Sequence, residues 1–180
     1  MADKPALEMR EISKTFNRVV EALKKVDLVV HPGEVHGLVG ENGAGKSTLM
    51  NILGGVIEKD EGTIRRHGKE VYFRSTQDAR DNAVSFIHQE LNLILDLRVY
   101  ENIFLGEELT GPAGIIDKKA MVAETKLILK KMEMDIDPEE VVGELDATKK
   151  QVVEIARALH QKSDLIIMDE PTTSLTDHEI

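Results

Sequence analysis

The stretch GENGAGKST, from Gly40 to Thr48, constrains the fold more than any other part of the chain. It fits G-x-x-x-x-G-K-[ST] at every fixed position, and it lies between an apolar run and a helix-favouring segment. Glycines tolerate positive φ and carry no Cβ, so successive backbone N–H groups can turn inward around phosphate oxygens. The pattern predicts a phosphate-binding loop in an α/β domain. The alternative is a glycine-rich strand-to-helix turn without a ligand.

Each member of this loop has an expected role. The helix that begins near Lys46 points its positive dipole end at the phosphates, Lys46 adds a full charge, and the Ser47 hydroxyl can ligate Mg²⁺. The expected ligand is therefore a nucleoside triphosphate. The residues predicted to bind it are Gly40, Glu41, Asn42, Gly43, Ala44, Gly45, Lys46, Ser47 and Thr48.

Two acids follow the apolar run LIIM near the end of the chain. Asp169 and Glu170 lie at the carboxyl end of a predicted buried strand, the place where ligands collect in a parallel α/β sheet. Asp169 can hold Mg²⁺ through water, and Glu170 can polarise a water molecule in line with the outer phosphoryl group. The alternative is two ordinary acids that close a strand.

Two further residues are weaker candidates. Gln89 follows the predicted strand AVSFI, where a neutral amide can reach Mg²⁺ or the attacking water, although it can also be a plain polar end cap. Phe16 can stack on a nucleobase or belong to the core.

The apolar pattern predicts an α/β chain. Alternation over residues 7–12 and β-branched residues over 26–30 indicate strands, and EVHGLVG, AVSFI and LIIM indicate buried strands. STLMNILGG reads as a helix closed by Gly54 and Gly55. A short hairpin is expected around Gly68. Further helices are expected over 75–82, within 99–131, and over 151–159, where Val152, Ile155, Ala156 and Leu159 share one face.

The bulk composition excludes several classes of protein. The formal net charge of −10 and the aromatic content of 3% disfavour nucleic acid as a main partner. The chain has no cysteine, so neither disulfides nor thiolate metal sites are possible. Residues 1–30 show no signal-peptide pattern, and no apolar run approaches the roughly 20 residues of a membrane helix. A link to a membrane is therefore expected to go through a partner.

Taken together, GENGAGKST, HQELNL, MDEP and SLTD resemble the ATPase subunit of an ABC transporter over nearly the whole chain. Within that family, the chain looks most like the ATPase subunits of bacterial monosaccharide importers of the ribose, galactose and xylose type. The segments that carry this likeness are GENGAGKSTLMNILGGV, HQELNLILDLRVYENIFLG and VVEIARAL. The resemblance implies a P-loop NTPase core of the RecA-like kind, with an N-terminal antiparallel β subdomain and an inserted helical subdomain. Residues 1–180 are then one incomplete nucleotide-binding domain, with the helical subdomain over about 91–159 and the remainder in about 1–90 and 160–180.

The resemblance also implies roles and partners. Phe16 matches the base-stacking aromatic residue, Gln89 the glutamine that senses Mg²⁺, Asp169 the metal-binding aspartate and Glu170 the catalytic glutamate. Residues 174–177 match a turn that crosses a dimer interface. A second ATPase domain, transmembrane permease subunits and, indirectly, a sugar-binding protein are the implied partners. The implied location is cytoplasmic, peripheral on the inner face of the cell membrane.

The sequence departs from the family where its signature, usually Leu-Ser-Gly-Gly-Gln, is expected. GELDATKKQ stands there, so Asp146 places a carboxylate where the family binds a phosphate, a repulsion of about 4 kcal/mol at roughly 4 Å and an effective dielectric of about 20. Asp146 is also a good N-cap for a helix from Ala147 onward. We expect the helix to form and its phosphate-binding role to be impaired.

The chain stops before the strand that carries the family's switch histidine, so we expect the front portion of a longer subunit. The leading hypothesis is an MgATP-binding subunit that couples ATP hydrolysis to sugar import, with no sugar indicated. The alternative is a nucleotide-binding or interaction module with little or no turnover. A soluble relative that acts on DNA or the ribosome is disfavoured by the acidic balance.

Overall fold

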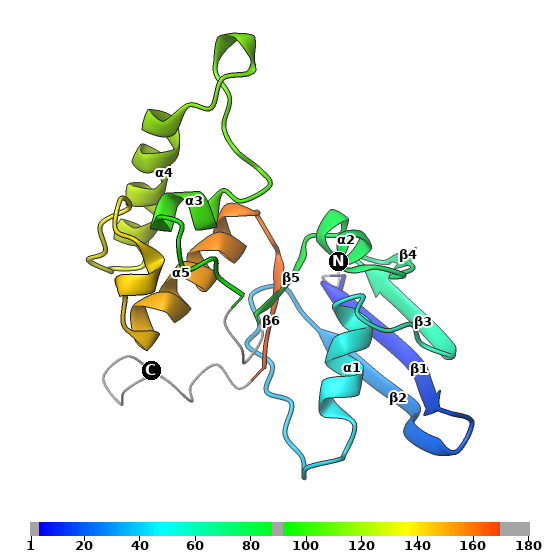
Figure 1. Ribbon diagram of the computed structural model, residues 1–180. Helices are drawn as coiled ribbons and strands as arrows, with labels where there is room; N and C mark the ends of the chain where they lie inside the picture. Colours follow the sequence, from blue (N-terminus) through cyan, green and yellow to red (C-terminus); the bar gives the residue numbers. More distant parts are fainter. Residues whose placement is uncertain (1–3, 88–91, 170–180) are drawn as a thin grey trace. The chain divides into compact units, whose positions relative to one another are not determined.

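The computed structural model describes residues 4–87 and 92–169 (Figure 1). The chain divides into two compact units, Met1–Val84 and Ser85–Ile180, which are described separately. No helix in the described ranges is long and apolar enough to cross a membrane.

The first unit is built on a four-stranded antiparallel sheet in the order β2-β1-β3-β4. The expected strands near the N-terminus are present as β1 (Leu7–Phe16) and β2 (Val20–Val30), and the expected hairpin is β3 (Glu61–Arg66) and β4 (Lys69–Val71). The helices are α1 (Lys46–Leu53) and α2 (Thr76–Asp81). The antiparallel subdomain expected from the resemblance is therefore confirmed.

A bulge in β1 brings the core of this sheet into register. Met9 and Ile12 are both fully buried although they are three residues apart, which an even strand would not allow. Glu11 has a φ of 49°, and the pairing of β1 with both neighbours shifts at this point. Gly62 of β3 lies opposite, where a Cβ would be 2.5 Å from the Arg10 carbonyl oxygen. The extra residue in β1 thus lets Met9 and Ile12 lie on the same face of the sheet, although the apolar residues of this strand do not alternate regularly.

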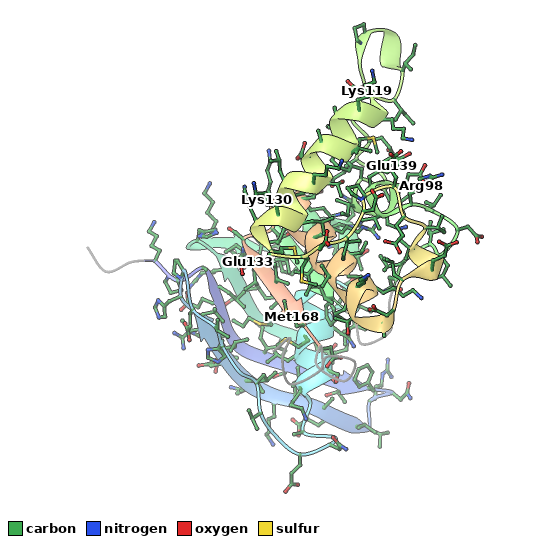
Figure 2. The ribbon with its side chains drawn as sticks, turned by 90° about the vertical axis from the view of Figure 1, so that its left-hand side faces the viewer. Arg98, Lys119, Lys130, Glu133, Glu139 and Met168 are labelled. Atoms are coloured by element: carbon green, nitrogen blue, oxygen red, sulfur yellow. The ribbon has the colours of Figure 1, made fainter. Side chains whose placement is uncertain are left out.

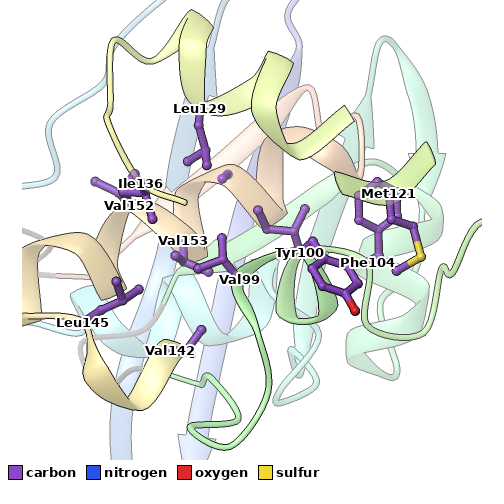
Figure 3. Packing of buried hydrophobic residues seen from close by; sticks show 12 residues of the cluster. Val99, Tyr100, Phe104, Met121, Leu129, Ile136, Val142, Leu145, Val152 and Val153 are labelled. Carbon is purple, nitrogen blue, oxygen red and sulfur yellow. The ribbon is translucent and has the colours of Figure 1, made fainter. Parts of the chain in front are cut away.

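The second unit combines a two-stranded sheet with a helical cluster. The two predicted strands are present as β5 (Val84–Ile87), which begins at the last residue of the first unit, and β6 (Leu165–Met168), and they pair with each other. The helices are α3 (Val99–Ile103), α4 (Lys118–Lys131) and α5 (Ala147–His160), with 3₁₀ turns η1 (Pro112–Gly114) and η2 (Val142–Glu144). Apolar side chains from the three α-helices and η2 form one core, seen in Figure 3.

A buried asparagine fixes the entry into this helical cluster. Asn102 of α3 has no exposed surface, and its side chain accepts from the Ile94 N–H at 2.8 Å and donates to the Ile94 carbonyl at 3.0 Å. These bonds satisfy an amide that would otherwise be costly to bury. The loop before α3 is therefore held by the helix itself.

One predicted strand is absent. Residues 34–40 have no regular secondary structure, and Val35 and Val39 are 100% and 94% exposed. A strand requires a neighbour to complete its hydrogen bonds, and no strand in the described residues pairs with this segment. Leu159 is a smaller correction, because it is 45% exposed at the end of α5 rather than on the buried face.

Candidate phosphate-binding site

The loop before α1 has the left-handed glycine conformations that a phosphate cradle needs. Gly43 has a φ of 85° and Gly45 a φ of 92°. The Ala44 N–H donates to the Glu41 carbonyl at 3.1 Å, which closes a turn inside the loop. Positive φ at both positions strains any other residue, so the spacing of the two glycines follows from the path of the backbone.

Gly45 is also the point where the loop rests on the sheet. A Cβ at this position would lie 2.6 Å from the Ala22 carbonyl oxygen and 2.8 Å from Leu23 Cδ2, both in β2. Real Cβ atoms do not approach so closely, so only glycine lets the loop lie this near β2. Ala22 and Leu23 are therefore supporting residues that the sequence alone did not reveal, because nothing local links them to a glycine more than twenty positions later.

The N-terminus of α1 is open. Its cap residue, Gly45, supplies no side-chain hydrogen bond, and its first turn contains no acid. The first N–H groups of a helix lack intrahelical partners and carry about half a positive charge between them. This donor set suits an anion, and nothing on the helix itself competes for it.

Lys46 folds back over the loop. Its Nζ donates to the Gly40 carbonyl at 2.8 Å and to the Glu41 carbonyl at 3.0 Å. This ammonium ties the end of the loop to its first two residues and adds a full charge beside the open helix end. Ser47 is exposed one residue further on, as a metal-ligating hydroxyl must be.

Phe16 lies at the end of β1 and is 38% exposed, so it is not a core residue. Lys14 Nζ is 5.8 Å from its ring centroid and also pairs with Asp60 Oδ1 at 2.7 Å. The other oxygen of Asp60 accepts from the Thr15 N–H at 2.7 Å. The Lys14 hydrogen bond, together with the Thr15 N–H, lowers the pKa of Asp60. Asp60 thus anchors the strand end that presents the ring.

The predicted acidic partners fall at the end of the second unit. Asp169 follows the carboxyl end of β6, as expected, and its N–H donates to the Ile87 carbonyl at 3.1 Å, so the carboxyl ends of β5 and β6 meet. Glu170 and Gln89 lie outside the described residues. Asp169 belongs to the second unit and the loop to the first, so their sharing of a magnesium ion stays a prediction.

The N-terminus of α5 is closed by its own chain. Asp146 Oδ1 accepts from the Lys149 N–H at 2.8 Å, which confirms the predicted N-cap. Lys150 Nζ points back to the Gly143 carbonyl at 3.4 Å. At least one of the N–H groups that a phosphate would need is therefore already bonded.

The chain is similar in sequence to known ATP-binding proteins of ABC transporters. Residues 23–173 match the ABC transporter family. The chain is 47% identical over 175 residues to the ribose import ATP-binding protein RbsA of Geobacillus kaustophilus, covering 97% of this chain and 35% of that protein. It is 46% identical over 174 residues to the galactose/methyl galactoside import ATP-binding protein MglA of Escherichia coli, covering 97% of this chain and 34% of that one. The chain thus spans about a third of the length of these curated relatives.

The fold of the chain is also similar to solved structures of ATP-binding cassettes of ABC transporters. The ADP conformation of an ATP-binding cassette of an ABC transporter matches with a TM-score of 0.83 and 27% identity, over 97% of this chain and 72% of that one. A nucleotide-free cassette matches with a TM-score of 0.82 and 24% identity, over the same shares of the two chains. From the matched sequence and the shared fold, this chain belongs to the ABC transporter family.

Proposed function

We propose that the chain binds MgATP and acts as part of the ATPase subunit of an importer for monosaccharides. The observation that carries this proposal is the open α1 N-terminus, where Gly45 leaves the helix uncapped and Lys46 stands beside it. The names of the curated relatives, which describe ribose and galactose/methyl galactoside import, support the sugar class. The individual sugar is left open.

In this proposal, residues 40–48 surround the phosphates, with backbone N–H groups of the loop and the Lys46 ammonium as donors. Phe16 stacks on the base. The Ser47 hydroxyl, Gln89 and Asp169 hold the Mg²⁺ ion directly or through water. Glu170 orients and polarises the attacking water. Bound ATP supplies the free energy of phosphoryl transfer, which the protein couples to movement of its partners.

The proposed partners follow from the same assignment. A second ATPase domain completes the nucleotide sandwich, a pair of permease subunits carries the sugar across the membrane, and a sugar-binding protein delivers it. The chain is then cytoplasmic and peripheral on the inner face of the membrane. Nucleic acid is not a proposed partner, because the net charge of −10 opposes it.

Nucleotide titration of the native chain and of Lys46→Ala tests the binding step. Loss of charge-assisted bonds to phosphate at about 1.5 to 3 kcal/mol each predicts roughly 100-fold weaker MgATP binding by the variant. Lys24→Ala removes an equal charge from an exposed position on β2 and is expected to leave the affinity unchanged. Equal affinities of the native chain and Lys46→Ala would remove the basis of the proposal.

A second candidate is a nucleotide-binding module with little or no turnover. The capped N-terminus of α5 favours it, because Asp146 already occupies the Lys149 N–H. Steady-state phosphate release from the purified chain, with Glu170→Gln as the comparison, distinguishes the two functions. Turnover that Glu170→Gln abolishes supports the ATPase, whereas tight MgATP binding with equally low release from both chains supports the module.

A further inference from the structure

The outward face of α4 has a charge pattern opposite to that of the whole chain. All residues of this helix are described, and its exposed members are Lys118, Lys119, Ala123, Lys126, Leu127, Lys130 and Lys131. This set holds five lysines and no acid, in a chain whose net charge is −10. The one acid of the helix, Glu124, turns toward His160 of α5, with 3.3 Å between Oε1 and Nδ1.

Three of these lysines form a stripe. Lys119, Lys126 and Lys130 are seven and four residues apart, spacings that place side chains on one face of a helix. Figure 2 shows Lys119 and Lys130 toward opposite ends of α4. Lys118 is excluded from the stripe because its Nζ pairs with Glu139 at 2.5 Å and lies 5.6 Å from the Tyr100 ring centroid.

An exposed aliphatic pair stands at the start of the same helix. Ile115 and Ile116 are 71% and 57% exposed. They belong to a small hairpin closed by hydrogen bonds from the Gly111 N–H to the Ile115 carbonyl at 2.8 Å and from the Asp117 N–H to the Leu109 carbonyl at 2.7 Å. The backbone therefore holds two aliphatic side chains in water, immediately before the lysine stripe.

We propose that Ile115, Ile116, Lys119, Lys126 and Lys130, here called the α4 face, contact the surface of an anionic lipid bilayer. Exposed lysines next to exposed aliphatic side chains are the combination that peripheral membrane-binding segments use, with the charges at the headgroups and apolar atoms reaching below them. The proposal does not require nucleotide binding.

Exposed acids border this face at both ends of α4. Asp117 Oδ1 accepts from the Ala120 N–H at 3.0 Å, and this exposed carboxylate keeps its negative charge two residues from Lys119. Glu133 and Asp135 follow the end of α4, so they weaken the contribution of Lys130 more than that of Lys119 or Lys126. Exposed charges farther away than a Debye length of about 8 Å are largely screened at physiological salt, so these bordering acids matter more to the face than the rest of the net negative charge.

Nucleic acid fits this face less well than a lipid surface does. Binding of single-stranded nucleic acid uses aromatic side chains that stack on the bases, and the exposed positions of α4 hold none. Duplex nucleic acid would use the lysines but would leave the isoleucine pair without a partner. An acidic protein surface remains the strongest competitor, and it is made an outcome of the test.

Vesicle flotation of the full chain provides the test. We compare vesicles of neutral phosphatidylcholine with vesicles that contain 30% phosphatidylglycerol, at low and physiological salt (about 0.15 M). At about 1 kcal/mol per lysine near an anionic surface, K119Q/K126Q/K130Q is expected to bind the anionic vesicles roughly 100-fold more weakly. I115S/I116S is expected to lose on the order of tenfold, because the apolar contact is gone. Circular dichroism confirms that each variant is folded.

The matched control is K24Q/K69Q/K162Q, which makes the same charge change at exposed positions elsewhere. Retention of anionic-vesicle binding in this control, with loss in the α4 variant, supports the proposal. Equal loss in both, equal binding of the native chain to neutral and anionic vesicles, or no binding at low salt overturns it. Binding to soluble polyglutamate without binding to vesicles also overturns it, in favour of an acidic protein partner. MgATP affinity is measured for K119Q/K126Q/K130Q as well. An unchanged affinity shows that the loss of vesicle binding is independent of the proposed nucleotide site.

Discussion

The helices α1 and α5 begin in opposite ways. α1 starts at a glycine with positive φ, has no side-chain cap and carries a lysine beside its free N–H groups. α5 starts at Asp146, whose carboxylate accepts from the Lys149 N–H. Both ends have the same intrinsic dipole, yet only the first is left available to an outside anion. The difference shows that the cap residue, rather than the helix, decides whether such an end can take a ligand.

The two ends also differ in what they depend on. The α5 end is self-contained, since Asp146 and Lys149 lie within one turn of each other. The α1 end depends on the close approach of Gly45 to Ala22 and Leu23 of β2, and hence on the sheet. We therefore expect the α1 end to be the more sensitive of the two to single substitutions.

The largest expected effect is that of Gly45→Ala. The new Cβ would meet the Ala22 carbonyl at 2.6 Å and Leu23 Cδ2 at 2.8 Å, at a φ of 92° that alanine rarely adopts. We expect a loss of about 3 kcal/mol in the free energy of unfolding, measured by urea denaturation, together with loss of MgATP binding.

Gly43→Ala is the matched control for this prediction. Its φ is 85°, but a Cβ there has nothing within 4 Å, so only backbone strain of about 1 kcal/mol is expected. If both variants lost equal stability, the close approach of the loop to β2 would have no energetic weight.

A smaller effect is expected at the other helix. Asp146→Ala removes the cap of α5 and should lower the free energy of unfolding by about 1 kcal/mol, whereas Asp146→Ser should restore most of it. Thermal and urea unfolding of the three chains measure this. An Asp146→Ala variant as stable as the native chain would mean that the carboxylate does not cap α5 in solution.

How far the sequence predicts this molecule depends on the range of the interactions. The Asp146 cap, the hairpin around Gly68 and the helix after the phosphate loop rest on residues within a few positions of one another, and all three are present. Features that depend on residues so close in the sequence can be predicted from the sequence alone.

Long-range features were not predictable in the same way. The segment 34–40 has the composition of a buried strand, but a strand also needs a pairing partner, and none is present in the described residues. The support of Gly45 by β2 and the anchoring of Thr15 by Asp60 join positions far apart in the chain. For the site itself, the positive φ of Gly43 and Gly45 and the helix after the loop are as expected, and the strand before the loop is absent. The roles of Gln89, Asp169 and Glu170 stay predictions.

The smallest expected effect concerns the sheet beneath the α1 end. The pKa of Asp60 is lowered in the folded protein, chiefly by the Lys14 hydrogen bond. Its stabilising contribution is therefore complete above the ordinary aspartate pKa and is lost as the pH falls through the lowered value. The side chain is 42% exposed, so solvent screening limits the effect to less than about 1 kcal/mol.

Unfolding at pH 7 and pH 3 measures this contribution. Asp60→Asn should reduce the stability at neutral pH and make the drop between the two pH values smaller than in the native chain. Asp96→Asn, which removes an equal charge at an exposed position of the second unit, is the matched control for the substitution itself. An Asp60→Asn variant with the full native pH response would show that Lys14 and Thr15 do not hold this carboxylate in solution.

The bare valines at 35 and 39 bear on how the purified protein is handled. Exposed β-branched side chains such as these favour association between protein molecules at high concentration. Lysine at both positions would sacrifice no packing in this chain, since the native side chains there contact almost nothing. Samples for titration or crystallisation are therefore best prepared dilute, or from such a surface-substituted version.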